Sequence, residues 1–444
     1  MGDPVVVPRS EHSLSRRLID PDALKVLYRL HQNGYTAYLV GGSVRDLLLG
    51  RRPKDFDIGT SAHPYQVKRL FRNCWIIGRR FRLAHVRFGM KTIEVATFRR
   101  QVSQAELDAA GTEVPGSVAT EPAAGIPLAA DGEAQDRLIH RDNTFGTPEE
   151  DAFRRDFTIN ALFYDIGTFS IIDYTSGLAD LEARIIRCIG DPTERFQEDP
   201  VRMMRAVMMA ARLDFTIDPP IDRAIEAHGA EIARSAPARL IEEFYKLLRT
   251  GASEKALRMM AGRRLLAPIA SELQEGAKEP LWRSLAAVDE YRKRFESTPE
   301  TLTNAVLLGS LLVPLGHNIR TLSPPPPPVA EGERPKEPKL ALGMLPLARR
   351  DVERLRHILL LQRRMTDLTL SPKARRALMH RGPFQEALTW LELHGNHPEA
   401  LEHWRGFMEA AKTFEPVEGE AAPADLPPRR RRRRRRRRGP RAPV

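Results

Sequence analysis

The sequence predicts an α+β protein with a small mixed-sheet domain, an all-α body and a disordered basic tail. Three observations lead to this prediction. Helix-like and strand-like segments alternate up to about residue 100, helical periodicity dominates from about residue 180 to 414, and an arginine run follows. At 444 residues the chain is long enough for two or three domains.

The sheet domain is expected over residues 21–180, after a flexible N-terminus at residues 1–20. The leucines of "ALKVLYRLHQNGY" predict an amphipathic helix that ends at Gly34. Next, "TAYLV" predicts a buried strand, "GGSV" a tight turn and "VRDLLLG" a short helix. A helix near residues 64–72 and the strand-like segments "FRLAHVRFG" and "KTIEVATFR" follow. Residues 101–137 are rich in Ala, Glu, Asp, Gly and Pro, which predicts a mobile surface loop.

The helical part is predicted by three amphipathic stretches: "DPVRMMRAVMMAARL", "ARLIEEFYKLLRTG" and "KALRMMAGRRLL". We divide it into a domain at residues 181–250 and a body at residues 251–414. A proline-rich insert at residues 320–338 interrupts the body, and residues 415–444 form the tail.

The net charge of +12 is concentrated at the C-terminus. The run at residues 429–438 and Arg441 give eleven positive charges against four acids in the last thirty residues. A run of like charges stays extended and solvated, and it favours the phosphate backbone of a nucleic acid as its partner. Another protein or an acidic surface is the alternative partner. The rest of the chain is only mildly basic.

Cysteine content and hydropathy indicate the compartment. Cys74 and Cys188 are too few for a zinc or disulfide framework and are expected to be ordinary buried thiols. We find neither an apolar run of membrane-spanning length nor a signal-peptide core. A cytoplasmic protein without a membrane partner is therefore expected.

Two acids stand two residues apart in "RRPKDFDIGT". Residues i and i+2 of a strand share one face, so Asp55 and Asp57 are expected side by side. Their mutual repulsion raises a pKa unless a cation intervenes, and a divalent metal with a phosphate substrate would supply that cation. The pattern also occurs by chance on solvated edges and turns.

The acidic pair follows "YLVGGSVRDLLLG". Gly41 and Gly42 allow the backbone to approach a ligand closely, and the helix N-terminus after them offers free amides to phosphate. Arg45 can add charge-assisted hydrogen bonds to a triphosphate. Alone, the Gly-Gly pair favours a plain turn, but together with "KDFDIGT" it indicates a phosphate cradle beside a metal site.

Two further stretches carry candidate site residues. Glu94 in "IEVATF" is either a polar residue on an edge or a third metal-site carboxylate. In "EEDAFRRDFTINALFYD", Arg154 and Arg155 can pair with phosphate, while Asp156 can orient them or serve the reaction centre. The alternative for this second stretch is a solvated, charged helix start.

The stretch "FQEDPVRMMRA" predicts a helix capped by Asp199. Glu198 and Asp199 precede Arg202 by four and three residues, so they can meet it on the helix surface. This is either a surface ion pair or a base-recognition site. In the second case a carboxylate accepts a hydrogen bond from the exocyclic amine of the base, and the arginine donates one to the neighbouring ring nitrogen. Adenine and cytosine both offer this pair of groups, so such a site would select these two bases but would not distinguish one from the other.

These motifs in this order resemble the class II nucleotidyltransferases, which contain bacterial poly(A) polymerases and CCA-adding tRNA enzymes. The matching stretches are "LVGGSVRDLLLGRRPKDFDIGT", "RRDFTINAL" and "EDPVRMMRA", within residues 20 to 250. The poly(A) branch is further resembled by "LFRNCWIIGRRFRLAHVRFG", "DNTFGTPEEDAFRRDFTIN" and the arginine-rich tail. The loop at residues 101–137 and the proline-rich insert depart from the family pattern.

The resemblance implies a polymerase-β-like nucleotidyltransferase head domain, a nucleotide-recognition helical domain and an RNA-binding body. It also implies that two Mg²⁺ ions bind Asp55 and Asp57, with Asp156 as a third catalytic acid. Nucleotide contacts are implied for Gly42, Arg45, Arg154, Arg202 and Arg205, and base recognition for Asp199 with Arg202.

The expected activity is template-independent transfer of AMP from ATP to RNA 3′ ends, with release of pyrophosphate. CCA addition to tRNA is the alternative within the class. An RNA-binding protein on a decayed scaffold is the alternative from another class, and the intact acids and arginines of the motifs argue against it.

Overall fold

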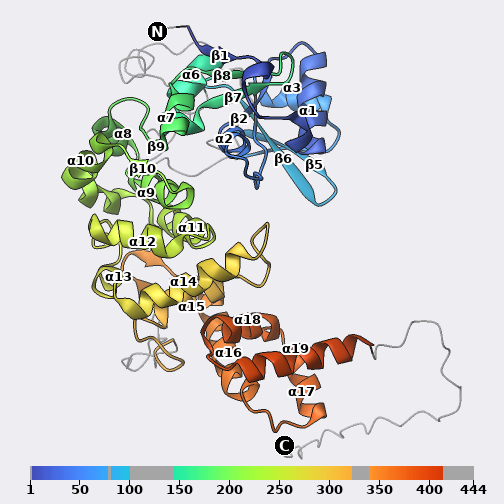
Figure 1. The fold of residues 1–444 in the computed structure, drawn as a ribbon, viewed down its shortest axis with the longest axis vertical. Helices are drawn as coiled ribbons and strands as arrows, with labels where there is room; N and C mark the ends of the chain where they lie inside the picture. The colour runs from blue at the N-terminus through green and yellow to red at the C-terminus, as the bar shows by residue number, and fades with distance from the viewer. Residues whose placement is uncertain (1–2, 79–81, 101–143, 323–339, 414–444) are drawn as a thin grey trace, which may run out of the picture.

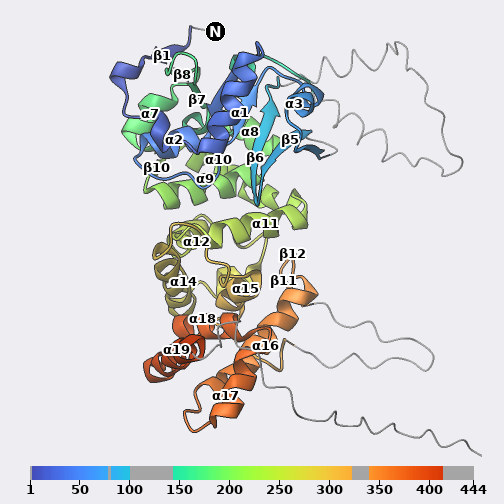
Figure 2. The ribbon, with the colours of Figure 1, turned by 90° about the vertical axis from the view of Figure 1, so that its right-hand side faces the viewer.

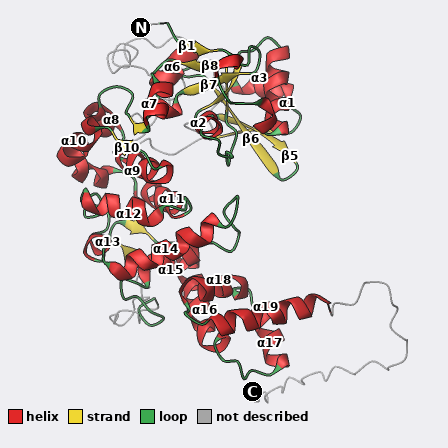
Figure 3. Cartoon of the chain, in the orientation of Figure 1, coloured by secondary structure: helices red, strands yellow, loops and turns green. Residues whose placement is uncertain are grey.

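The computed structural model describes residues 3–78, 82–100, 144–322 and 340–413. Figure 1 shows the sheet domain (residues 3–176) at one end and the helical part extending away from it. In Figure 3 the large sheet lies within the sheet domain, while most of the remaining ribbon is helical. The expected loop at 101–137, most of the proline-rich insert and the tail at 415–444 lie outside the described residues.

The described residues of the sheet domain form one eight-stranded sheet, in the order β1-β8-β7-β2-β3-β6-β5-β4. Neighbouring strands are antiparallel except β3 and β6, which are parallel, so the predicted mixed sheet is confirmed. The strands are β1 (Val5–Val7), β2 (Ala37–Val40), β3 (Ile58–Thr60), β4 (Cys74–Ile77), β5 (Leu83–Phe88), β6 (Lys91–Thr97), β7 (Leu162–Asp165) and β8 (Ile171–Asp173).

Both faces of this sheet are covered. Alternate residues of β2 belong to separate cores, with Leu39 in the large one and Val40 in a small one. Helices α1 (Pro21–Gln32) and α3 (Pro64–Leu70) pack on the face of Leu39. On the other face, Ala152 of α6 (Pro148–Phe153) joins the small core. The short helix α2 (Gly42–Leu48) follows β2 directly, as predicted.

The expectation of a flexible N-terminus is wrong for residues 5–14. Strand β1 pairs with β8 at the edge of the sheet, and Leu14 is fully buried in the large core. His12 adds a hydrogen bond through Nε2 to the Phe169 carbonyl at 2.9 Å. Because the valine run finds its hydrogen-bond partners in a strand about 165 residues away, local sequence offers little signal for it.

The helical part begins after β8 and confirms the predicted helical body, although it also contains short strands. Figure 2 shows α9, α11 and α12 next to the sheet domain, with α14, α15 and then α16–α19 further away. Its helices are α7 (Gly177–Ala183), α8 (Pro192–Glu198), α9 (Val201–Leu213), α10 (Pro219–His228), α11 (Pro237–Leu248), α12 (Ser253–Gly262), α13 (Ser271–Glu275), α14 (Glu279–Lys293), α15 (Asn304–Leu312), α16 (Arg349–Met365), α17 (Pro372–Met379), α18 (Phe384–His394) and α19 (Pro398–Thr413). Short strands β9 (Ile185–Ile186) and β10 (Thr216–Ile217) pair in parallel, and β11 (Ala341–Leu342) and β12 (Leu345–Pro346) form a hairpin.

Two further expectations concern the cysteines and the membrane. Cys74 and Cys188 are free and buried, as predicted. Burial raises the pKa of Cys188 to about 11, which makes it an unreactive thiol at neutral pH. No helix within the described ranges has both the length and the apolar character that crossing a membrane requires.

Candidate active site

The glycine turn lies between β2 and α2 and requires Gly41. This residue has a φ of +69°, a conformation that side-chain-bearing residues rarely adopt. A Cβ atom at Gly41 would also lie 2.8 Å from Nη1 of Arg155, which is too close. The turn therefore brings the backbone up against an arginine from the distant "RRDFTINAL" motif.

The acidic pair lies in the extended segment that enters β3. The backbone N–H of Val40 donates to the Asp57 carbonyl at 3.0 Å, which ties this segment to the end of β2. Ile58 pairs with Val95 in the parallel β3–β6 register, so Asp57 is the neighbour of Glu94. Their side chains share the sheet face opposite α1 and α3.

The neighbouring carboxylates act on one another electrostatically. The pKa of Asp57 is raised to about 6 by burial, by the charge of Glu94 and by that of Asp55, while Arg155 acts in the opposite direction. The accessible surface of Asp57 is nevertheless that of an exposed residue, so its carboxylate can be reached from solvent. Asp55 is exposed as well, with 70% of its side chain accessible beside Lys54.

This donor set fits Mg²⁺. Within the described residues, no three His, Cys, Asp or Glu side chains lie close enough to form a complete metal cage. Magnesium commonly uses one or two carboxylates and fills its remaining positions with water and substrate phosphate. Asp55 and Asp57 meet that requirement. Glu94 is half-exposed and 3.7 Å from His85, and it adds negative charge beside Asp57.

Arg154 and Arg155 are held by a buried acid that the sequence analysis missed. Asp151 accepts from Nε of Arg154 at 2.9 Å and from Nη2 of Arg155 at 2.9 Å. Arg155 also donates to the carbonyl of Asn160 at 3.0 Å. The spacing of three and four residues was a visible signal, because such pairs meet on one face of a helix.

Arg45 differs from its expected role. Its side chain is buried and donates to Asp46 through Nε at 2.9 Å and Nη2 at 2.7 Å. Nη1 donates to the side-chain oxygen of Asn160. Asp46 also pairs with Arg212 of α9 at 2.8 Å. In this structure Arg45 therefore joins the glycine turn to α9 instead of presenting its guanidinium to a triphosphate.

Asp156 also has a different environment from that of a third metal acid. It is buried and pairs with Arg205 of α9 at 2.7 Å, while its other oxygen accepts from Asn160 and the Phe157 N–H. Burial opposes ionisation, but Arg205 and these hydrogen bonds together lower its pKa. Asp156 thus anchors α9 to the sheet domain.

Asp199 and Arg202 do not pair with each other. Asp199 lies between α8 and α9 and accepts a two-pronged pair of hydrogen bonds from Arg239 of α11, at 2.9 and 2.6 Å. The prediction that Asp199 caps α9 is wrong, because α9 begins at Val201 and its N-cap is Pro200. Arg202 donates instead to Glu198 at 3.0 Å and to the Arg195 carbonyl at 2.9 Å.

Arg195 is a second residue that the sequence analysis missed. Its buried guanidinium donates to the carbonyls of Arg154 and Arg155 at 2.7 and 2.6 Å, and to Glu198 at 2.9 Å. Arg195 therefore joins the arginine motif of the sheet domain to the segment that carries Arg202.

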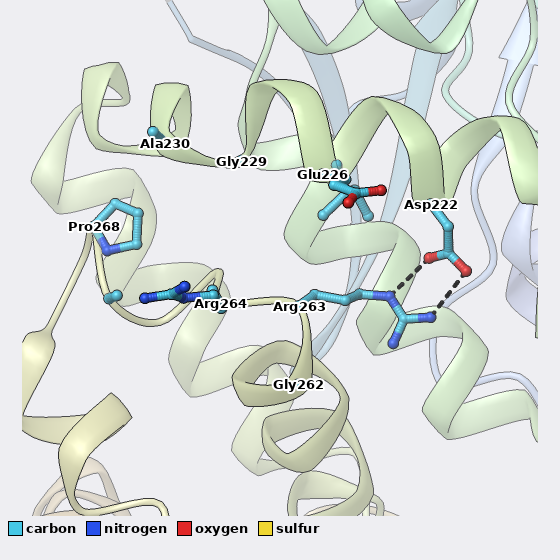
Figure 4. A pocket seen from close by; sticks show the side chains of 10 residues that line it. Asp222, Glu226, Gly229, Ala230, Gly262, Arg263, Arg264 and Pro268 are labelled. Atoms are coloured by element: carbon cyan, nitrogen blue, oxygen red, sulfur yellow. Dashed lines mark hydrogen bonds and ion pairs between the residues drawn. The ribbon is translucent and has the colours of Figure 1, made fainter.

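A separate pocket lies in the helical part, with a volume of about 740 Å³. Figure 4 shows it between the end of α10 and the turn after α12, with the ion pair of Arg263 and Asp222 on one side and Arg264 on the other. It contains none of the predicted site residues, so this pocket and the acidic site are distinct.

The raised pKa of Asp57 predicts how stability depends on pH in the metal-free protein. The folded state holds this proton more tightly than the unfolded state, whose pKa is about 3.8. Protonated Asp57 therefore contributes to the free energy of unfolding at low pH. This contribution is lost as the pH rises from about 4 through about 6. We expect the Tm of the wild type minus that of Asp57→Asn to fall across this window in EDTA. A constant difference would contradict the assignment.

The fold and site define a class of protein. A mixed sheet that presents an acidic pair beside a glycine turn, joined through arginines to a helical part, is typical of a nucleotidyltransferase. Three family descriptions match the chain: "Poly A polymerase head domain" at residues 37–187, "Probable RNA and SrmB- binding site of polymerase A" at residues 214–276, and "Polymerase A arginine-rich C-terminus" at residues 341–438. The chain belongs to this poly(A) polymerase family.

Curated relatives agree with the family assignment. The chain is 49% identical over 246 residues to poly(A) polymerase I of Salmonella typhi, covering 55% of this chain and 49% of the relative. Against poly(A) polymerase I of Haemophilus influenzae it is 40% identical over 259 residues, covering 58% and 53%. A CCA-adding enzyme of Lactobacillus johnsonii is 35% identical over 237 residues, covering 53% and 52%. The matches span about half the length of these relatives.

Solved structures share the fold. The Bacillus stearothermophilus CCA-adding enzyme in complex with CTP has a TM-score of 0.52 at 25% identity, covering 88% of this chain and 83% of that chain. A tRNA nucleotidyltransferase complexed with a primer tRNA and an incoming ATP analog has a TM-score of 0.50 at 22% identity, covering 87% and 98%.

Proposed function

We propose that this protein transfers AMP from ATP to RNA 3′ ends without a template and releases pyrophosphate. The observation that carries the proposal is the neighbouring position of Asp57, directly before β3, and Glu94 on β6, with the pKa of Asp57 raised by burial and by the surrounding carboxylates. Such a concentration of negative charge beside a glycine turn suits a cation-bound triphosphate. The relatives named poly(A) polymerase I support AMP as the transferred group.

In the proposed reaction the 3′-hydroxyl of RNA attacks the α-phosphate of ATP. Asp55 and Asp57 would hold two Mg²⁺ ions, which lower the pKa of the attacking hydroxyl and neutralise the triphosphate when bound. Arg154 and Arg155, fixed by Asp151, would pair with phosphate oxygens. The close approach of Gly41 to Arg155 places the glycine turn beside the arginine that would make these phosphate contacts.

Recognition of the base is assigned to the segment between α8 and α9. A carboxylate oxygen of Asp199 would accept from the exocyclic amine of adenine, and Arg202 would donate to the adjacent ring nitrogen. The hydrogen bonds to Asp199 and Arg202 leave acceptor and donor capacity on both groups, because a carboxylate has about four lone pairs and a guanidinium five N–H groups.

CCA addition to tRNA is the second candidate function. The likeness to the Bacillus stearothermophilus CCA-adding enzyme, bound to CTP, favours it. The match to the arginine-rich C-terminus favours poly(A) synthesis, because a charged run binds any phosphate backbone without selecting a tRNA end. A cytoplasmic location fits either activity.

We expect ATP alone to give long homopolymers on unstructured RNA, whereas CTP alone gives little extension. The measurement is extension of a short labelled RNA and of a tRNA lacking its CCA end, with Mg²⁺ and each nucleotide in turn. Addition of two C and one A to the truncated tRNA, followed by a stop, would overturn the proposal in favour of CCA addition. Incorporation of no nucleotide on either RNA would favour a non-catalytic RNA-binding protein.

A further inference from the structure

Strand β4 is an edge strand that exposes apolar side chains on one of its two faces. It is the last strand in the order of the large sheet and pairs with β5. Trp75 is 50% exposed and Ile77 is 51% exposed, whereas Cys74 on the other face is buried in the large core. Natural edge strands are commonly protected by charged side chains, because an apolar edge invites unwanted pairing. An exposed tryptophan at this edge therefore indicates a functional role.

The strand register places Trp75 in one row with the candidate metal-site acids. Trp75 pairs with His85 of β5, and His85 pairs with Glu94 of β6. Glu94 is in turn the neighbour of Asp57, through the parallel register of β3 and β6. Paired residues of adjacent strands direct their side chains to the same face of a sheet. The row therefore runs from the acidic site to the edge of the sheet.

The face that carries this row is the one opposite α3. This helix packs against β4, β5 and β6 from the side of the large core. In Figure 1, α1 and α3 lie on the side of the sheet that is away from the helical part. Along the row, His85 is 22% exposed and lies 3.7 Å from Glu94, which is 52% exposed. Solvent, and hence a ligand, can reach the row between the acids and Trp75.

The distance and the chemistry of this edge suit a strand of RNA. Neighbouring strands lie about 4.8 Å apart, so β4 is about 14 Å from β3, beside which the 3′-hydroxyl would react. A helically stacked strand rises by about 3.4 Å per nucleotide, so Trp75 would meet one of about the last four nucleotides. Arg87 is exposed on β5, two residues from His85 and on the same face, where its charge can attract phosphate.

We propose that the indole of Trp75 is a stacking site for one base of the RNA primer, close to its 3′ end. This inference rests on the proposed function and deepens it, because it names a contact that holds the RNA beside the acids. Stacking uses the flat face that every base offers, so it binds the strand without selecting a sequence. That property suits template-independent addition, in which the nucleotides near the 3′ end change with every cycle.

The test begins with a short single-stranded RNA and the full chain, without ATP. Tryptophan fluorescence reports Trp75 selectively, because the other three tryptophans (Trp282, Trp390 and Trp404) are at most 7% exposed. We expect RNA to quench the fluorescence of the wild type. In Trp75→Phe the quenching should disappear while most of the affinity stays, because phenylalanine still offers a flat ring.

Trp75→Ala removes the ring and is expected to weaken RNA binding about tenfold, the usual effect of losing one base–aromatic stack. In extension assays this variant should raise the KM for RNA, and the KM for ATP should stay at the wild-type value. Tyr65→Ala is the matched control. Tyr65 is 59% exposed and lies on α3, behind the opposite face of the sheet, so its removal should leave RNA affinity unchanged. Thermal unfolding of each variant is measured in parallel, and Trp75→Phe provides the comparison if Trp75→Ala does not fold.

RNAs with a single abasic nucleotide at successive positions from the 3′ end locate the stacked base. For the wild type, affinity should fall at one position among about the last four. At that position Trp75→Ala should bind the intact and the abasic RNA equally, because the same contact is already lost. Losses that add would overturn the inference. Unchanged RNA affinity in Trp75→Ala would also overturn it and would assign this edge to a protein partner.

Failure of the proposed function is recognised separately. In that case the wild type would not extend RNA with ATP, whereas quenching and affinity are measured without ATP and would still report whether Trp75 binds a base.

Discussion

Replacing Asp57 by alanine is expected to lower nucleotide incorporation about a thousandfold or more, since metal-ion catalysis supplies several kcal/mol of transition-state stabilisation. Asp57 is the acid that neighbours both Asp55 and Glu94, and its raised pKa reports the negative charge around it. Removing it leaves the remaining carboxylates too few to hold the triphosphate-bound cations. RNA affinity should change little, because the match to an RNA-binding region lies at residues 214–276.

The measurement is single-turnover extension of a labelled RNA with ATP and Mg²⁺, together with RNA binding by filter retention. Asp22→Ala is a suitable control, because it removes an acid of α1 that pairs with Lys25 at 2.8 Å outside the candidate site. Asp57→Asn keeps the shape of the side chain and tests the charge alone. Near-normal extension by a folded Asp57→Ala protein would exclude the proposed metal site.

Replacing Asp156 by alanine is expected to destabilise the protein by about 3 kcal/mol, at the lower end for a broken buried pair. Asp156 is buried, and Arg205, which is 37% exposed, would lose its partner at 2.7 Å. Asn160 and the Phe157 N–H would lose an acceptor as well. We expect a value at the lower end of this energy range because water reaches the exposed part of Arg205 and compensates part of the lost ion-pair energy.

Urea unfolding of Asp156→Ala, Arg205→Met and the double variant measures this effect. We expect the double variant to be more stable than Asp156→Ala, because replacing both partners leaves no unpaired charge. Asp156→Ala should also reduce incorporation, since α9 carries Arg202. If Asp156→Ala keeps full stability and loses only activity, the residue is a catalytic acid, as the family resemblance implies, and its structural role is secondary.

The sequence by itself determined the order of elements around the site. The turn after β2, helix α2, strands β5 and β6 and the amphipathic helices of the body follow from local periodicity and glycine positions. The sequence also allows the prediction that Asp57 and Glu94 lie close together, since both stand in strand-like segments. Asp151 was also within reach, because its spacing to Arg154 and Arg155 is helical.

Only the tertiary structure decided how the polar groups pair. The spacing of Asp199 and Arg202 predicts that the two meet, but the carboxylate of Asp199 binds Arg239, 40 residues away. Arg45 binds Asn160, 115 residues away, and Asp156 pairs with Arg205 of α9. Strand β1 likewise depends on β8. Local periodicity predicts which face of an element is apolar, but a charged side chain takes the partner that the packed fold brings nearest, and that choice depends on contacts between distant segments.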